Sequence, residues 1–367
     1  NDASYDIPKY HFNVKAAYAF AARFYLYTRR YKEAEAYATL ALGGTVDKQL
    51  NILNEGVPVL RNFWRQSYNT SNSAVMAYYS AEEASNLMLI PTMSWYNISR
   101  GSRFSINRDA KAATYYGHGP AWNTDFTHYY CHPCYAGSMY IRASQEYGNF
   151  FIKGIYLFEY TDKIAGIGYG HNIRGEFTQE EALLTRAEAR IWLGKEQQAI
   201  DDLQTWELNR ENNNVSGIQY RPVNRQTIDD FYGDFTWIDS RDQKAGDVGY
   251  VIKNGIVKPL NIELVHPSAD YPYNPSMENL LQCVLHFRRI ETAEDGLRWF
   301  DIRRYGIEVT HNIGASQSVT LKWDDPRRCL QIPAEVISSG FQPNVRTLSA
   351  AEGQSTQIKP SDLRVKY

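Results

Sequence analysis

The stretch "VKAAYAFAARFYLYTRRYKEAEAYATLAL", residues 14–42, decides the fold because two helical patterns follow one another with a short break between them. In the first pattern, apolar residues recur at the three- and four-residue spacing of a helix face, namely Ala17, Ala21, Phe24 and Tyr25. The second pattern places one apolar set on the next helix, namely Ala34, Tyr37, Ala38 and Ala41. Residues 14–42 are therefore predicted to form a helical hairpin.

A second copy of this pattern occupies residues 180–206, "EEALLTRAEARIWLGKEQQAIDDLQTW", in which Gly194 supplies the turn. Aligning the copies places Ala22 on Ala187 and Ala34 on Ala199. Small residues at matching positions allow helices to approach closely, as they do in stacked tetratricopeptide repeats. The sequence predicts a mainly α fold built on tetratricopeptide-like hairpins.

The composition excludes some partners. Lys and Arg total 39 against 41 acidic residues, so a formal charge of -2 provides no field to attract nucleic acid. No apolar run approaches the length of a membrane span. Aromatic residues make up 14% of the chain, although its mean hydropathy is -0.50. This combination favours polar ligands that are bound by flat rings.

Two stretches lack sustained periodicity, residues 51–175 and residues 212–275. The first is rich in Tyr, Asn, Ser and Gly, and the second is punctuated by Pro and Gly. Long irregular segments inside a compact protein are usually functional. We therefore expect both to be irregular ligand-binding insertions.

The segment "LLQCVLHFRRIETAEDGLRWFDIRRYG", 280–306, combines apolar and charged residues. Its apolar stripe, predicted to be that of one packed helix within 276–306, consists of Ile290, Ala293, Leu297 and Phe300. Trp299 and Ile302 are expected on another side of the same helix. Asp301 and Arg304, three residues apart, can pair within the helix, as can Glu294 with Arg298 and Asp295 with Arg298. The pattern indicates a buried, charge-paired scaffold.

The same segment closely resembles the charged and aromatic motif of the SusD/RagB family of outer-membrane nutrient-binding lipoproteins. The matching residues are Arg288, Arg289, Glu291, Gly296, Arg298, Trp299, Phe300, Asp301, Arg303, Arg304 and Gly306. Asp295 replaces the usual Glu, and "FQPNVR" stands where the family usually ends in N-P-G. The two hairpins and "CLQIPAEVISSG" are also similar to family segments, so the resemblance covers about half of the chain.

The resemblance implies a single SusD-like domain over residues 1–367, with the motif packing the C-terminal helices against the repeats. It also implies a non-catalytic, lipid-anchored protein on the outer face of a Gram-negative outer membrane. Such proteins capture glycans, or in some members peptides, for a SusC-like TonB-dependent transporter. The first residues lack a signal peptide or lipidated Cys, so we expect that an N-terminal part carrying the anchor is missing.

A sugar ring stacks its C–H face on an aromatic side chain, while amide and carboxylate groups bind its hydroxyl rim. The ligand-binding candidates in the first insertion are Trp95, Tyr96, Asn97, Trp122, Asn123, Asp125, Tyr129 and Tyr130, and those in the second are Trp237 and Asp239. The alternative for each ring is that it fills the core of the loops, because Trp and Tyr also bury well.

The "CHPC" segment, Cys131 to Cys134, has the spacing of a redox or half-zinc motif but lacks the context of either. A small-loop disulfide or two thiols are expected there, while Cys283 and Cys329 are expected to be separate and buried. No metal ligand and no cofactor are assigned from the sequence, and whether a metal ion is bound in the loops stays open.

Two other functions fit the sequence less well. A tetratricopeptide scaffold that binds peptide would show more complete repeats and fewer insertions. A helical glycoside hydrolase would need paired carboxylates, and acids such as Asp125 and Asp239 form no marked pair. The sequence therefore favours glycan binding without catalysis.

Overall fold

The computed structural model describes residues 2–47, 52–61, 80–93, 119–123, 155–210, 219–233, 259–265, 270–293, 295–313 and 317–344. The chain divides into two compact units. The first unit comprises residues 1–257 and 274–298, and the second comprises residues 258–273 and 299–367. The predicted mainly α fold is confirmed, whereas the extent of a single domain over the whole chain stays a prediction.

Both predicted hairpins are present in the first unit. The first consists of α1 (Val14–Tyr27) and α2 (Tyr31–Ala41), and the second of α5 (Gln179–Trp192) and α6 (Glu196–Leu208). The two turns correspond: Arg29 has φ +65° and Gly194 has φ +71°. Glycine adopts this left-handed conformation without the steric cost that a Cβ atom imposes. The repeat thus extends to the backbone of the turn.

The buried positions also correspond between the two copies. Ala22, Ala34, Ala187 and Ala199 are all at most 1% exposed, which confirms their predicted place at helix contacts. The predicted face of α1 is wrong, however. The helix buries Ala16, Ala19, Ala22 and Leu26 instead, and Phe24 is 47% exposed. Small alanines let α1 approach its neighbours, and the large aromatic residues consequently lie outside this contact.

Helix α5 is the centre of the first unit. It packs against α1, α2, α6 and α10 (Glu278–Glu291), and every one of its residues is buried. Arg186 forms two hydrogen bonds with Asp202 of α6, at 3.0 and 2.7 Å. Arg190 binds Glu35 of α2 at 3.1 Å and Asp202 at 2.9 Å. Because buried charges are costly unless paired, these contacts fix how the two hairpins stack.

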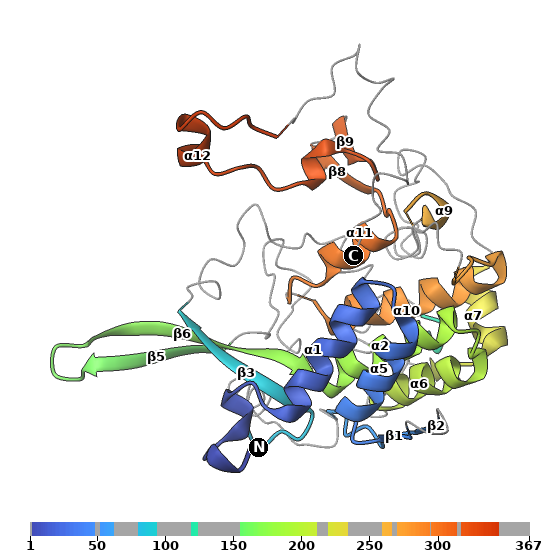
Figure 1. Ribbon diagram of the computed structural model, residues 1–367, viewed down its shortest axis with the longest axis horizontal. Helices are drawn as coiled ribbons and strands as arrows, with labels where there is room; N and C mark the ends of the chain where they lie inside the picture. The colour runs from blue at the N-terminus through green and yellow to red at the C-terminus, as the bar shows by residue number, and fades with distance from the viewer. Residues whose placement is uncertain are drawn as a thin grey trace. The chain divides into compact units, whose positions relative to one another are not determined.

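The first irregular insertion contains regular strands, which corrects the expectation for residues 51–175. Strands β3 (Asn86–Met93), β6 (Ile167–Thr178) and β5 (Ile155–Asp162) form an antiparallel sheet in that order. Leu87 and Leu89 of β3 are buried on the face toward α1, whereas the long β5–β6 hairpin projects away from the helices (Figure 1). Strands β3 and β6 lie far apart along the chain, so no local pattern predicts that they pair, whereas β5 and β6 form a hairpin.

Shorter elements surround this framework in the first unit. The 3₁₀ helices are Asp2–Ser4, Pro8–Tyr10 and Pro275–Met277. Strand β1 (Thr45–Asp47) pairs with β2 (Ile52–Asn54), and β4 (Trp122–Asn123) pairs with β7 (Gln219–Tyr220). The described part of the second insertion also includes α7 (Arg225–Tyr232), whose N-terminus is closed by a capping box between Asn224 and Thr227.

The motif segment forms two helices, which corrects the prediction of one helix within 276–306. Helix α10 ends at Glu291, and α11 spans Arg298–Arg304. Gly296, with φ +78°, turns the chain between them. Ile290, Ala293 and Leu297 are buried as predicted. Phe300, which lies on the separate helix α11, is 47% exposed. The predicted pair of Asp301 and Arg304 is present at 2.7 Å.

The second unit contains α9 (Ile262–Val265), α11, the strand pair β8 (Val309–Ile313) and β9 (Gln317–Leu321), the 3₁₀ helix Pro326–Arg328 and α12 (Ala334–Ser338). Arg328 is 5% exposed, and its guanidinium donates to the carbonyl groups of Leu321, Lys322 and Ile307. These bonds tie β9 to the chain that follows α11. Burial, together with the nearby charge of Arg303, lowers the pKa of Arg328.

Candidate functional site

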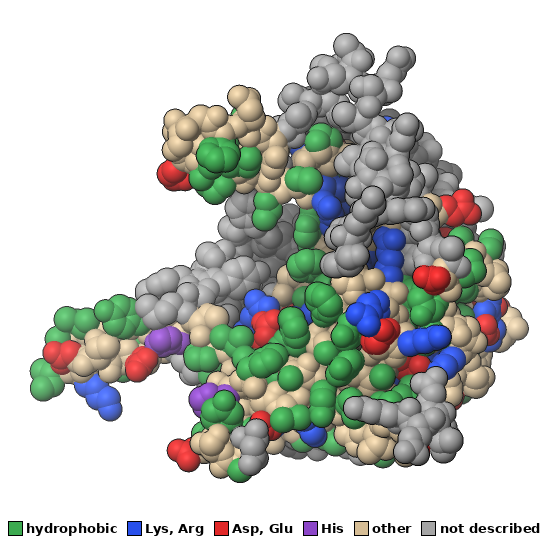
Figure 2. All heavy atoms as spheres, in the orientation of Figure 1, with side chains coloured by type: hydrophobic (Ala, Val, Ile, Leu, Met, Phe, Trp, Pro, Cys, Tyr) green, Lys and Arg blue, Asp and Glu red, His purple; other side chains and the backbone are tan. Residues whose placement is uncertain are grey.

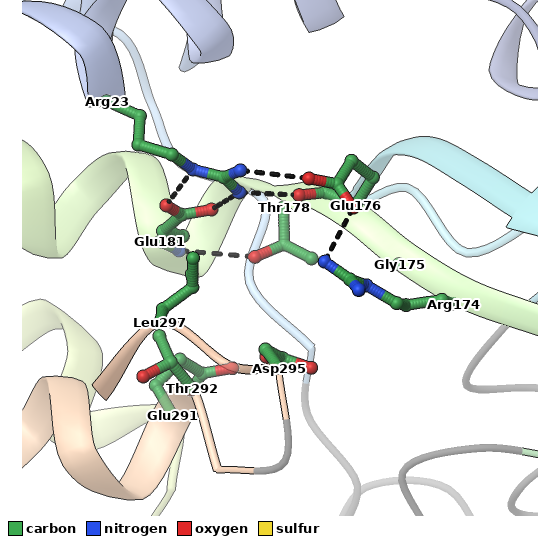
Figure 3. Close-up of a pocket in the computed structure, with 10 residues that line it drawn as sticks. All are labelled: Arg23, Arg174, Gly175, Glu176, Thr178, Glu181, Glu291, Thr292, Asp295 and Leu297. Atoms are coloured by element: carbon green, nitrogen blue, oxygen red, sulfur yellow. Dashed lines mark hydrogen bonds and ion pairs between the residues drawn. The ribbon is translucent and has the colours of Figure 1, made fainter. Parts of the chain in front are cut away.

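A polar hollow lies in the first unit where the end of β6, the start of α5 and the turn after α10 meet. Figure 3 shows the residues that line it, namely Arg23, Arg174, Gly175, Glu176, Thr178, Glu181, Glu291, Thr292, Asp295 and Leu297. Arg23 reaches it from α1, so side chains from three helices and one strand converge there. The enclosed space is about the size of one ordered water molecule. A larger ligand would therefore bind across its mouth.

Arg23 is the central side chain of the hollow. Its Nε and Nη2 atoms each lie 2.7 Å from an oxygen of Glu181, and its Nη1 atom lies 2.9 Å from Glu176 Oε1. The guanidinium carbon also lies 4.4 Å from the centre of the Phe177 ring. Burial lowers the pKa of Arg23, but the carboxylates of Glu181 and Glu176 outweigh it and hold the pKa above its usual value. Arg23 is thus a permanent cation that ties α1 to β6 and α5.

The rim of the hollow is set by the junction between β6 and α5. Thr178 is the N-cap of α5, and its hydroxyl accepts a hydrogen bond from the backbone of Glu181 at 3.2 Å. Arg174 Nη2 lies 2.7 Å from Glu176 Oε2. The Arg174 side chain is 44% exposed, whereas that of Glu176 is 20% exposed. Arg174 therefore offers donors to solvent beside a carboxylate acceptor.

This arrangement is suited to binding hydroxyl groups. Glu176 and Glu181 are held by guanidinium groups, so they act as hydrogen-bond acceptors in fixed positions. Within the described ranges, no three His, Cys, Asp or Glu side chains are grouped in a way that could hold a metal ion. The hollow therefore offers hydrogen-bond donors and acceptors to the hydroxyl groups of a polar ligand.

The β5–β6 hairpin presents aromatic side chains beyond the hollow. Phe158 and Tyr160 are an edge-to-face pair with ring centres 4.8 Å apart. Tyr160 is 53% exposed, and Tyr169 on the opposite face of the hairpin is 52% exposed. In Figure 2, hydrophobic side chains lie along this projecting hairpin and over the region of α1. Exposed rings on a regular hairpin are available to a ligand.

Of the ten predicted ligand-binding residues, the structure describes Trp122 and Asn123, both in β4. The other eight lie outside the described residues, namely Trp95, Tyr96, Asn97, Asp125, Tyr129, Tyr130, Trp237 and Asp239. Which of these side chains gather around a ligand therefore stays a prediction.

Trp122 is a core residue, which corrects its place among the stacking candidates. It is 1% exposed, and its ring centre lies 5.8 Å from that of Phe287 and 5.7 Å from that of His286. Gly119 lies so close to the indole ring that a Cβ atom there would be 2.1 Å from it. No ring face is left for a sugar. A Trp122→Ala substitution would remove a buried ring, a change that typically costs about 3–5 kcal/mol.

The cysteines differ from expectation in one respect. Cys283 is buried as predicted, but Cys329 is exposed, because it follows the short 3₁₀ helix at the surface of the second unit. Burial raises the pKa of the Cys283 thiol well above its usual value. The "CHPC" segment lies outside the described residues.

Sequence reasoning missed both the hollow and the exposed aromatic pair. The signal for the pair was present in "FEYTDKIAGIGYG", 158–170. Aromatic residues stand at every second position before the turn, and glycines stand at every second position after it. The period of two is that of a strand with one face free of side chains. No such signal exists for the hollow, because Arg23 and its partners are distant in the sequence.

Comparison with known proteins gives structural matches alone. No protein-family model matches the chain, and no curated protein does. Within the described ranges, no helix combines the length and the apolar character needed to cross a membrane.

Five chains of solved structures match, among them two SusD-like proteins. One is a SusD-like protein from Bacteroides fragilis NCTC 9343, with 14% identity and a TM-score of 0.40, over 94% of this chain and 67% of that one. The other is a SusD-like carbohydrate binding protein from Bacteroides vulgatus ATCC 8482, with 14% identity and a TM-score of 0.34, over 86% of this chain and 52% of that one. The chain is similar to these two structures and spans only part of each.

Proposed function

We propose that this chain is a non-catalytic glycan-binding protein of the cell surface, which captures oligosaccharide and delivers it to a TonB-dependent outer-membrane transporter. The observation that carries the proposal is how the charged motif of residues 288–306 packs. The resemblance to the SusD/RagB motif implies that these residues join the C-terminal helices to the repeats. Their contacts in the first unit agree with this role.

The contacts of α10 with the second hairpin illustrate this packing. Glu291 Oε2 accepts hydrogen bonds from Trp206 Nε1 at 2.9 Å and from Arg210 Nη2 at 2.7 Å. Arg288, which is fully buried, lies 3.4 Å from the Thr185 hydroxyl and 3.7 Å from Glu188. These motif residues therefore stabilise the scaffold, which leaves ligand binding to the side chains outside it.

The ligand-binding role falls to the two insertions, residues 51–175 and residues 212–275. We retain Trp95, Tyr96, Asn97, Asn123, Asp125, Tyr129, Tyr130, Trp237 and Asp239 as candidates, and we remove Trp122 because it is buried. Flat rings bind the apolar face of a sugar, and the polar members bind its rim. No catalytic role is assigned, because Glu176, Glu181 and Glu291 of the hollow serve in ion pairs with arginines.

The proposed partner would cover the outer face of α1. Phe12, Phe20 and Phe24 are 54%, 49% and 47% exposed, and successive ring centres lie 6.1 and 6.3 Å apart. An exposed apolar stripe of this kind favours a protein contact. The resemblance implies that the repeats face the transporter. A lipid anchor would hold the protein at the outer membrane.

The glycan assignment is tested by native affinity electrophoresis against soluble plant, microbial and host polysaccharides, with an unrelated protein of similar size as the control. We expect one polymer class to retard the chain, with no release of reducing ends from that polymer. Migration that no polymer changes would overturn glycan binding. Release of reducing ends would overturn the non-catalytic assignment.

The partner contact is tested with a Phe20→Ser and Phe24→Ser double variant. It should no longer co-purify with a TonB-dependent transporter, identified by mass spectrometry, from a detergent extract of the source membrane. Its retention on the polymer should be unchanged. Equal transporter recovery with the double variant and with the unmodified protein would remove α1 from the contact.

A further inference from the structure

One face of strand β6 joins the aromatic pair to the polar hollow. Side chains alternate along a strand, so Gly168, Gly170 and Arg174 share one face. Paired residues also share a face, and Tyr160 pairs with Gly168 while Phe158 pairs with Gly170. The register of β6 shifts between Gly175 and Phe177, and the ion pair of Arg174 with Glu176 keeps the Glu176 carboxylate beside this face. The aromatic and polar groups therefore lie along a single surface.

The glycines make the aromatic end of this surface flat. A Cβ atom on Gly168 would lie 2.8 Å from the Phe158 ring and 2.1 Å from the carbonyl oxygen of Glu159. The Phe158 ring thus lies against bare backbone, and it supports the edge of Tyr160. Tyr160 keeps about half of its surface exposed. The two rings lie at 74° to one another, so Tyr160, supported by Phe158, is the platform on which a sugar ring can stack.

The other end of the surface offers charges that are already paired. Arg23 is paired with Glu176 and Glu181, Arg174 with Glu176, and Glu291 with Arg210. An acidic ligand would have to compete with these carboxylates for the arginines, whereas neutral hydroxyl groups can use both the donors of Arg174 and the carboxylate of Glu176 without breaking the pairs.

We propose that this face of β6, from the Phe158 and Tyr160 platform to Arg174 and Glu176, is a binding track for a neutral oligosaccharide. The proposal rests on the glycan-binding function proposed above and specifies the substrate class. Six residues of strand separate Gly168 from Arg174, which corresponds to about 20 Å. A single sugar cannot span this length, so the track binds a chain of several sugars.

The test uses the full chain and a polymer panel that contains neutral glucan, mannan and xylan together with acidic polygalacturonate and alginate. Tyr160→Ala removes the platform, and Tyr160→Phe keeps its ring. The matched control is Tyr169→Ala, because Tyr169 is equally exposed on the same hairpin but on the opposite face. Melting temperatures establish that all three variants are folded.

We expect a neutral polymer to retain the unmodified protein, and Tyr160→Ala to weaken its binding at least tenfold. Tyr160→Phe and Tyr169→Ala should stay within twofold of the unmodified protein. Oligosaccharides should compete at concentrations at which the monosaccharide does not.

Three results would overturn the track. They are equal weakening by Tyr160→Ala and Tyr169→Ala, retention by acidic polymers alone, and retention that Tyr160→Ala leaves unchanged. In each of these cases the glycan-binding function stands. If no polymer retains the unmodified protein, the proposed function itself fails, and the track fails with it.

Discussion

Protonation of His286 is predicted to destabilise the first unit. His286 lies on α10 and is 3% exposed, and its Nδ1 atom is 2.8 Å from the hydroxyl of Tyr232. Its Nε2 atom is buried and finds no hydrogen-bond partner among the described residues. Burial, followed by the positive charges of Arg289 and Arg298, lowers the pKa of His286 from 6.5 to about 3.

The sign and size of the effect follow from proton linkage. Between pH 6.5 and pH 3 the unfolded chain binds a proton at this residue and the folded chain does not, so stability decreases as the pH decreases. Each pH unit in this window changes the free energy of unfolding by about 1.4 kcal/mol. Lowering the pH from 7 to 5 should therefore cost about 2 kcal/mol through His286 alone. This is a substantial part of the 5–15 kcal/mol that typically stabilises a domain.

The assay is urea unfolding at pH 7 and pH 5 of the unmodified protein and of His286→Gln. The unmodified protein should lose about 2 kcal/mol more than the variant between the two pH values. His11→Gln is the matched control, because His11 is exposed and stacks on Tyr5. It should preserve the full pH dependence of the unmodified protein.

Equal losses in the unmodified protein and in His286→Gln would refute the reasoning. If His286→Gln does not fold, NMR titration of the unmodified protein decides the question. The His286 ring signals should not titrate between pH 7.5 and pH 5, and a midpoint near 6.5 would contradict the prediction.

Two further predictions concern the helical framework. Asp202→Asn should lower the free energy of unfolding by about 3–5 kcal/mol, because it weakens the partner of two buried arginines, whereas the exposed neighbour Asp201→Asn should change it by less than about 0.5 kcal/mol. Chemical denaturation of both variants measures the free energy of unfolding. Similar losses in the two variants would show that the ion pairs of Asp202 do not stabilise the framework. Gly194→Ala should cost about 1 kcal/mol because Gly194 has φ +71°, and Gly194→Asn should recover part of that loss in thermal unfolding; an unchanged melting temperature for Gly194→Ala would contradict the strain.

The aromatic candidates mark the boundary between what sequence and structure each contribute. Trp122 and Tyr160 both lie in strands and both are amphipathic rings, yet Trp122 is 1% exposed and Tyr160 is 53% exposed. The difference comes from Phe287 and His286, which lie far along the chain from Trp122 and cover it. Composition shows that rings are present, but the segments that fold over them decide which rings a ligand can reach.

The sequence by itself determined the helical hairpins and their repetition. Helix periodicity and small residues are local properties, so Ala22 and Ala187 could be assigned to matching contacts from spacing alone. Only the tertiary structure decided which face of α1 is buried, that α10 ends at Glu291, and that Arg23 meets Glu176 and Glu181. Each of these depends on neighbours that are distant along the chain, and a local pattern carries no information about them.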